Sequence, residues 1–265
     1  MVLERLISMK TALRQPQWML ILGGLVSVIC LFISFVVFQT STGLMTSLLV
    51  TIAVTPLMLR LVRYDEKKEE LEAKFAAEGN ILARHRDILT IYSAFFSGMI
   101  ITLSIVFILL PSVTGEKIFS DQLKEINLIR GNVAFGDTLQ RIIFNNIGVL
   151  FLSFVFSFLF GAGAIFILAW NASILAAAIG MAAKSLGGVT GLPFAVLAFF
   201  PHGSLEILAY FIGGVAGGLI SAAITRKKSP RFNFIVKDTA QLMLISVLVL
   251  SLAALVESIE IALSA

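Results

Sequence analysis

The chain has 265 residues, of which 58% are hydrophobic and 14% are charged, and its mean hydropathy is +0.98. Since soluble domains carry about 25% charged residues, this composition excludes an ordinary soluble protein and predicts an integral membrane protein. The formal net charge of +4 does not indicate a nucleic-acid partner, because basic residues of membrane proteins mainly set their orientation.

Seven apolar segments approach or exceed the roughly 20 residues that a helix needs to cross a bilayer. These runs are continuous and do not alternate, which favours helices over the strands of a barrel. We therefore predict an all-α fold, a polytopic transmembrane helical bundle of about seven spans in contact with the lipid bilayer. The fifth segment is short and made of small residues, and a re-entrant segment is the alternative there. The segments are 18–39, 44–62, 89–111, 140–168, 170–186, 193–224 and 239–262.

The distribution of Lys and Arg predicts the orientation of the chain. The N-terminal segment carries three, residues 60–88 carry seven and residues 225–238 carry five, whereas the other connecting segments together carry five. If all seven segments cross, 15 basic residues fall on one side and 5 on the other. The positive-inside rule then predicts that the N-terminus lies inside and the C-terminus outside.

Three parts follow from this pattern: an N-terminal transmembrane hairpin (1–63), a charged cytoplasmic linker helix (64–88) and a membrane domain (89–265). Glu and Lys at helical spacing make the linker a solvated connector or a docking surface for a membrane or cytoplasmic protein partner. His85, within the linker, is assigned no role. Between the third and fourth spans, residues 112–139 have the pattern of an amphipathic helix that lies on the outer surface or caps the bundle.

The stretch FFPHGSLEILAYFIGG at 199–214 places ionisable residues in a strongly apolar region. His202 and Glu206 are four residues apart, so a helix presents them on one face, where the imidazole can hydrogen-bond the carboxylate. Pro201 cannot donate to the helical ladder and Gly203 permits a bend. We therefore expect a break or kink of this span at the Pro-His-Gly motif.

Amides elsewhere in the apolar segments are candidate partners for this pair. Asn145 and Asn146 open the fourth span, and Asn171 is expected at the junction of the fourth and fifth. Because buried amides in lipid need partners, we hypothesise one intramembrane polar cluster with His202 and Glu206. Two such ligands are too few for a zinc site, so no metal, no cofactor and no catalytic residue are expected.

Glycines on the later spans predict close helix packing. Gly213 and Gly217, each followed by a second glycine, form overlapping small-xxx-small patterns. Packing within the chain is one interpretation, and a homodimer interface is the other. The glycines assigned to helix packing are Gly161, Gly163, Gly180, Gly213 and Gly217.

Two long stretches, FNNIGVLFLSFVFSFLFGAGAIFILAWNASILAAAIG and FFPHGSLEILAYFIGGVAGG, resemble the stage II sporulation protein M family, most of all its archaeal members of unassigned role. The resemblance covers about 140–220 and implies that Asn145, Asn146, Gly161, Gly163, Asn171, Gly180, Pro201, His202, Gly203, Glu206 and Gly213 are family positions. One departure is Ala172, where family members often have glycine, which puts a left-handed turn there in doubt. The family is named for a membrane protein of endospore engulfment that is thought to scaffold peptidoglycan-remodelling enzymes.

Two functions follow as expectations. The resemblance, the charged linker and the glycine faces favour a membrane scaffold or assembly component without catalytic activity. The alternative is a proton-linked transporter or channel that uses the intramembrane pair of His202 and Glu206, since ionisable residues inside a membrane mark such pathways. An enzyme is not expected, because no serine or cysteine lies beside a base in any recognised arrangement.

Overall fold

The computed structural model describes residues 9–74, 80–131, 138–161, 163–225 and 232–264, and all the regular structure in these ranges is helical. Seven of the described helices are long and apolar enough to cross a membrane, which confirms the predicted all-α bundle, and one of them, Ala164–Ser185, contains nearly all of the fifth predicted segment. The long helices are α3 (Gln17–Val37), α4 (Thr42–Lys74), α6 (Arg86–Leu109), α9 (Thr138–Phe160), α10 (Ala164–Ser185), α11 (Leu192–Thr225) and α12 (Phe232–Ser264). The short ones are α2 (Met9–Arg14), α5 (Ile81–Arg84), α7 (Ser112–Ile118), α8 (Ser120–Gly131) and η1 (Gly188–Gly191).

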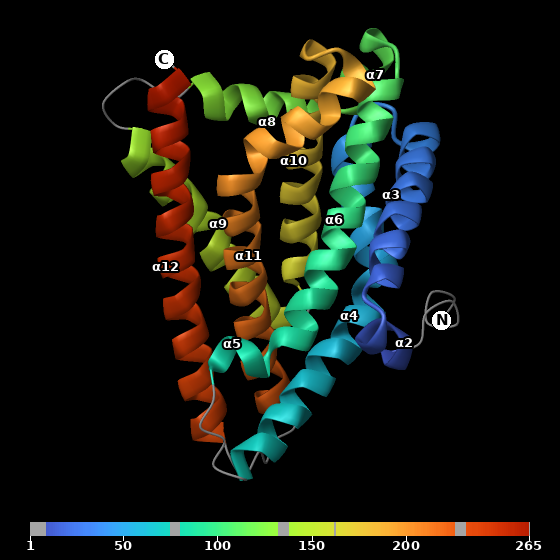
Figure 1. Cartoon of the computed structure of the whole chain (residues 1–265). Coiled ribbons are helices and arrows are strands. Elements are labelled where there is room, and N and C mark those ends of the chain that lie inside the picture. Colours follow the sequence, from blue (N-terminus) through green and yellow to red (C-terminus); the bar gives the residue numbers. More distant parts are fainter. Residues whose placement is uncertain (1–8, 75–79, 132–137, 162, 226–231, 265) are drawn as a thin grey trace.

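Successive long helices run in alternating directions between two ends of the bundle (Figure 1). The α5 end carries α2, α5 and the C-terminal extension of α4, and the α8 end carries α7, α8 and the end of α12. Where they are described, the basic residues that the sequence places on one side lie on α2, the second half of α4, α5 and the first turns of α6 and α12, all of which are at or lead to the α5 end. Arg5, Arg226, Lys227, Lys228 and Arg231 lie outside the described residues.

The N-terminal hairpin packs into the bundle through a close contact between α3 and α6. A side chain at Gly23 would collide with the backbone carbonyl of Phe95, and one at Gly98 would collide with that of Leu20. Two glycines facing each other's helix in this way let the backbones approach, as is common inside membranes. The hairpin and the later helices therefore share one core.

The boundary between α9 and α10 differs from the one that we predicted. The apolar pattern predicted it near residue 169, but α9 ends at Phe160 and α10 begins at Ala164. Gly161 has a φ of 76°, a conformation that glycine adopts at little cost, and it ends the helix. Gly161 therefore makes a turn, and Asn171 lies inside α10 rather than at a junction. Ala172 is also within α10, so no turn occurs there.

The expected break at Pro201 is not an interruption of the helix. α11 continues through Pro201 and Gly203 as one α-helix, and Figure 1 shows its orange ribbon bending before it descends through the bundle. A proline inside a helix removes one hydrogen bond of the ladder and favours a kink at that position.

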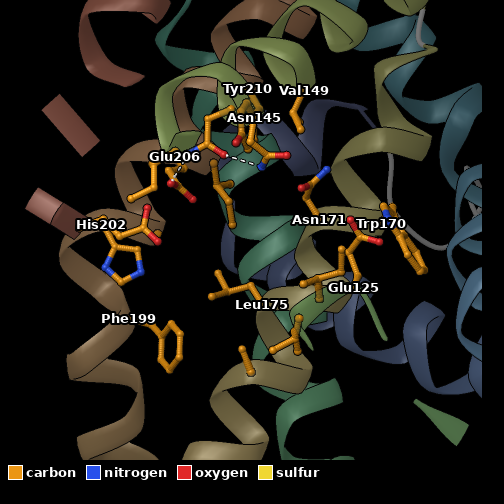
Figure 2. Close-up of a pocket in the computed structure, with 18 of the residues that line it drawn as sticks. Glu125, Asn145, Val149, Trp170, Asn171, Leu175, Phe199, His202, Glu206 and Tyr210 are labelled. Atoms are coloured by element: carbon orange, nitrogen blue, oxygen red, sulfur yellow. Dashed lines mark hydrogen bonds between the residues drawn. The ribbon is translucent and has the colours of Figure 1, made fainter. Parts of the chain in front are cut away.

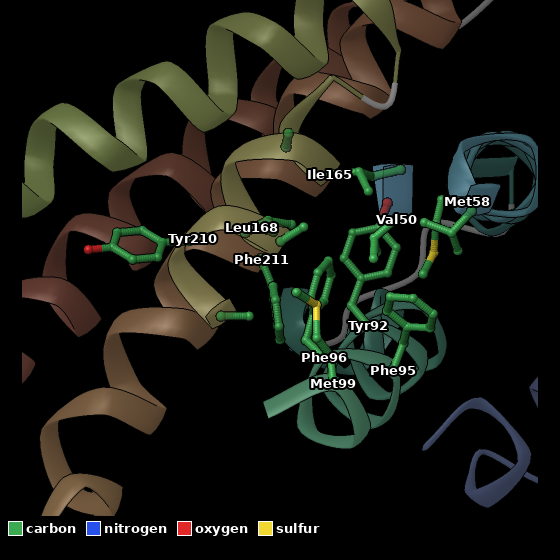
Figure 3. Close-up of a cluster of buried hydrophobic side chains, with 14 of the residues drawn as sticks. Val50, Met58, Tyr92, Phe95, Phe96, Met99, Ile165, Leu168, Tyr210 and Phe211 are labelled. Carbon is green, nitrogen blue, oxygen red and sulfur yellow. The ribbon is translucent and has the colours of Figure 1, made fainter. Parts of the chain in front are cut away.

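Many of the large buried side chains meet where α4, α6, α10 and α11 pack together (Figure 3). The ring of Phe96 stacks on Phe211 with centroids 5.3 Å apart, and Tyr92 meets Phe211 edge-on at 5.9 Å. Aromatic pairs of this kind add to the packing of the core. Many large apolar side chains of α3, α9 and α12 are exposed instead, as expected for surfaces that contact lipid.

Glycines of α10 and α11 bring these helices close to their neighbours. A side chain at Gly213 would collide with Leu150, and one at Gly217 would collide with the carbonyl of Phe154, both on α9. A Cβ at Gly180 would lie 2.9 Å from the Phe107 side chain of α6. These glycines face helices of the same chain, so the face proposed for a homodimer is occupied within the protein. Gly163 is the N-cap residue of α10, beside the turn at Gly161.

Candidate functional site

The close approach of α9 and α11 places an amide against a carboxyl group. Because Gly213 and Gly217 allow α9 to pack near α11, Asn146 on α9 comes within hydrogen-bonding distance of Glu206. Its Nδ2 donates to Glu206 Oε1 at 2.5 Å. Asn145 Nδ2 in turn donates to Asn146 Oδ1 at 3.2 Å. Asn146 is buried and Asn145 is exposed, so the chain of donors leads from the surface of α9 to Glu206.

His202 bonds a residue that the sequence motifs did not indicate. Its Nδ1 lies 2.5 Å from Glu260 Oε2 on α12, and its ring lies 5.8 Å from that of Phe199. The expected hydrogen bond between His202 and Glu206 is therefore replaced: His202 pairs with α12, while Glu206 bonds side chains of both α9 and α12. The physical reason is that α12 packs along α11 and brings two acids to this face.

Glu257 is the second of these acids. Its carboxyl group forms a side-chain hydrogen bond with Glu206. A hydrogen bond between two carboxyl groups requires a proton on one of them, because an ionised carboxylate only accepts. A polar connection thus runs from Asn146 on α9 through Glu206 on α11 to Glu257 on α12.

A cavity of about 930 Å³ lies beside this connection. Its walls come from α8, α9, α10, α11 and α12, and Figure 2 shows His202 and Glu206 on one side with Asn171 and Trp170 on the other. The five residues predicted to form the polar cluster all line it: Asn145, Asn146, Asn171, His202 and Glu206. Glu125, Gln140, Tyr210 and Glu257 add further polar groups to the lining.

Asn171 faces the cavity without joining the other amides. Its Nδ2 donates to the carbonyl of Ile167 in its own helix at 2.8 Å. The structure therefore brings the predicted residues to one cavity but not into one hydrogen-bonded cluster. Pro201 is exposed, while Gly203 is buried, with Leu175 at 3.6 Å from where its Cβ would be.

The acids of α12 were missed, although the sequence carried a signal for them. Glu257 and Glu260 stand three residues apart in the apolar stretch LVESIEIAL, a spacing that puts them on one helical face. Both lie near the predicted end of the last span, where charged residues are common and indicate no site. The sequence did not indicate Glu125 either, because a charged residue is common on a surface helix and does not by itself predict a site inside the bundle.

A second polar cluster at the α5 end accounts for His85. His85 Nδ1 lies 2.5 Å from Asp65 Oδ2, with both side chains 1% exposed. Arg84 pairs with the buried Asp238 of α12 at 2.7 Å and lies over the ring of Phe234. The described part of the linker is thus joined to α4 by a buried hydrogen bond and to α12 by a buried ion pair, and these contacts position α5 against the bundle.

Neither cluster has the arrangement of a metal centre. Within the described ranges, no three His, Cys, Asp or Glu side chains are placed so that they could hold a metal ion. What the cavity offers instead is a space for a small molecule, with acids, amides and aromatic rings around it.

Comparison with known proteins places these helices in a family context. The family model described as Stage II sporulation protein M matches residues 93–259. The uncharacterized protein MJ0793 of Methanocaldococcus jannaschii is 30% identical over 142 residues, which are 51% of this chain and 75% of that protein. No solved structure matches the chain. The matched residues contain every described residue that lines the cavity.

Proposed function

This chain belongs to the stage II sporulation protein M family, as its motifs predicted, and we propose that it is a proton-linked membrane transport protein. In this proposal the cavity between α8 and α12 is the solute site, and Glu206 with Glu257 carries the proton. The observation that carries it is the position of the carboxyl pair: Glu206 and Glu257 share a hydrogen bond at the wall of a cavity of about 930 Å³.

The cost of placing such groups in a membrane supports a functional role. Ionisable side chains within membrane-spanning helices are rare, and they commonly mark solute or proton pathways. A scaffold needs a stable bundle and partner surfaces, for which an apolar core of the kind seen around Phe96 and Phe211 is sufficient. A polar cavity with three acidic residues from three helices, Glu125, Glu206 and Glu257, is not needed for a scaffold.

The orientation is part of the proposal. The α5 end carries most of the described basic residues, so we place it in the cytoplasm of a prokaryotic cell. The α8 end, the cavity rim and the end of α12 then face outward. Solute would enter the cavity from outside, and transport requires that it also opens toward the α5 end.

Access to the cavity can be measured with single-cysteine variants, without knowledge of the solute. The chain has one cysteine, Cys30, which is buried in α3, so a Cys30→Ser background is suitable. Asn145→Cys reports on the rim and Asn171→Cys on the deeper wall. Each is exposed to a charged, membrane-impermeant thiol reagent from one side of oriented vesicles. Leu248→Cys is the control, because Leu248 is an exposed apolar residue within α12 and should face lipid.

Transport predicts that Asn171→Cys reacts from both sides, whereas Asn145→Cys reacts from the α8 side and Leu248→Cys from neither. Reaction of Asn171→Cys from a single side under all conditions contradicts transport. That result would favour the scaffold role expected from the resemblance, and copurification of partner proteins through 64–88 would then be the next experiment.

A further inference from the structure

We propose that the cavity binds an organic cation, either a protonated amine or a quaternary ammonium compound. This inference names the solute class of the proposed function and rests on it for access of water to the cavity. The charge, the size and the wall chemistry of the cavity support it.

Among the described residues that line the cavity, the charged groups are mostly acidic. The described ionisable residues that line it are three acids from three helices, Glu125, Glu206 and Glu257, together with Tyr210 and with His202, whose imidazole bonds Glu260. Neither Lys nor Arg occurs among its described lining residues. Converging carboxyl groups in a low-dielectric site attract cations and repel anions.

A neighbouring cavity shows the opposite chemistry. It measures about 450 Å³ and is lined by Lys124 and Lys184 together with Glu116. Lys124 and Glu125 are adjacent on α8 but line different cavities, so this helix turns its base toward one and its acid toward the other. The way α8 packs therefore keeps Lys124 out of the larger cavity and leaves Glu125 in its lining.

The size of the larger cavity excludes a bare metal ion as the matching ligand. Pockets for small molecules typically measure about 300–1,000 Å³, and the volume of about 930 Å³ lies in that range. Metal ions need several ligands in contact, and no suitable group of three exists among the residues that are described.

The walls suit an organic cation in a second way. The aromatic rings of Trp170, Tyr210 and Phe199 line the cavity, and such rings attract ammonium groups through cation–π interactions. Asn171 donates its Nδ2 to the carbonyl of Ile167, which leaves its side-chain oxygen as the acceptor that it can offer to a ligand. That oxygen accepts a hydrogen bond from a protonated amine.

Binding a cation beside the carboxyl pair changes its proton content. The proton shared by Glu206 and Glu257 leaves to water as the cation enters, so one positive charge replaces another and no bond to carbon changes. Cation and proton therefore compete, and cation binding strengthens as the pH rises. The other described titratable groups around the carboxyl pair and its cavity are His202 and Tyr210 on α11, Glu260 on α12 and Glu125 on α8.

Fluorescence of Trp170 tests the inference on the full chain in lipid nanodiscs. The protein has two tryptophans, and Trp18→Phe leaves Trp170 as the reporter. The probes are methylammonium, choline and tetraethylammonium, and 3,3-dimethylbutanol serves as the uncharged isostere of choline. We expect a saturable change with at least one cation, none with the isostere, and tighter binding at higher pH.

Charge-neutralising variants identify the site. Glu206→Gln and Glu257→Gln should each weaken cation binding by about tenfold or more, since a tenfold change corresponds to about 1.4 kcal/mol. Glu116→Gln is the matched control, because Glu116 lines the basic cavity, and it should bind as the parent does. Equal binding of the isostere, no response to any of the three cations, or unchanged affinity in both glutamine variants overturns the inference.

The two proposals fail separately. Two-sided labelling of Asn171→Cys without cation binding overturns the cation inference and leaves transport standing. Saturable cation binding with one-sided labelling overturns transport and leaves a binding site that opens to one side.

Discussion

Asn146 on α9 donates a hydrogen bond to Glu206 on α11 across 60 residues of sequence, and this contact joins the two helices at the wall of the cavity. Glu206 also bonds Glu257, so the carboxyl group is held from two sides. The site therefore depends on how closely α9, α11 and α12 pack.

Replacing Asn146 by leucine should destabilise the protein. The half-buried Glu206 would lose its amide donor, and an orphaned polar group costs about 1–3 kcal/mol. Thermal unfolding in nanodiscs measures the loss. Asn145→Leu is the control and should cost less, because Asn145 is exposed. If both variants lowered the unfolding temperature equally, the hydrogen bond between Asn146 and Glu206 would not be what stabilises the protein.

The glycines of α11 should be intolerant of side chains. A Cβ at Gly217 would collide with the carbonyl of Phe154, so Gly217→Ala should separate α9 from α11 and cost about 1–3 kcal/mol, measured as a lower unfolding temperature in nanodiscs. Gly148→Ala on α9 is the matched control, because nothing lies within 4 Å of the position that its Cβ would take; replacing a helical glycine there should be neutral or stabilising. A harmless Gly217→Ala would argue against the observed approach of the helices.

The role of the charge on Glu206 can be separated from its hydrogen bonds. Glutamine keeps an acceptor for Asn146 and a donor for Glu257, so Glu206→Gln should change stability by less than about 1 kcal/mol, whereas Glu206→Leu should cost about 1–3 kcal/mol. In the proposed function, Glu206→Gln also removes the pH dependence of transport. A glutamine variant that transports with unchanged pH dependence would assign the proton to another group.

The buried ion pair at the α5 end should be sensitive to loss of one partner. Arg84→Met leaves Asp238 without its cation in a position where it is 2% exposed, and breaking a buried pair costs about 3–5 kcal/mol. Asp87→Asn alters the more exposed pair with Lys68, in which Asp87 is 43% exposed, and should cost less than about 1 kcal/mol. The double change Arg84→Met with Asp238→Leu should recover most of the loss of unfolding free energy, and failure to do so would point to additional roles of Arg84.

The helices could be predicted because their signal is local. Each span is a continuous apolar run, and the turn at Gly161 was the boundary most clearly misplaced, since a glycine that ends a helix and a glycine that packs against one look alike in sequence. The sequence around Pro201 also predicted a kink, because a proline inside a helix removes one backbone hydrogen bond. The remaining backbone hydrogen bonds of α11 keep it a single helix.

The partners within the site could not be predicted in the same way. His202 and Glu206 share one helical face, which made them candidates for each other, but their choice depends on which helix packs beside α11. That helix is α12, and its acids Glu257 and Glu260 compete successfully for both residues. His85 likewise gained a role only from the folding of α5 against α4 and α12.

An experimental structure of the protein in lipid nanodiscs, examined for water around Glu206, tests the proposed site most directly. A solute site predicts a hydrated cavity in which ordered water or a ligand lies between Glu206 and Asn171. A dry space filled by lipid-facing or core side chains, with Glu206 bonded only to protein, would contradict it.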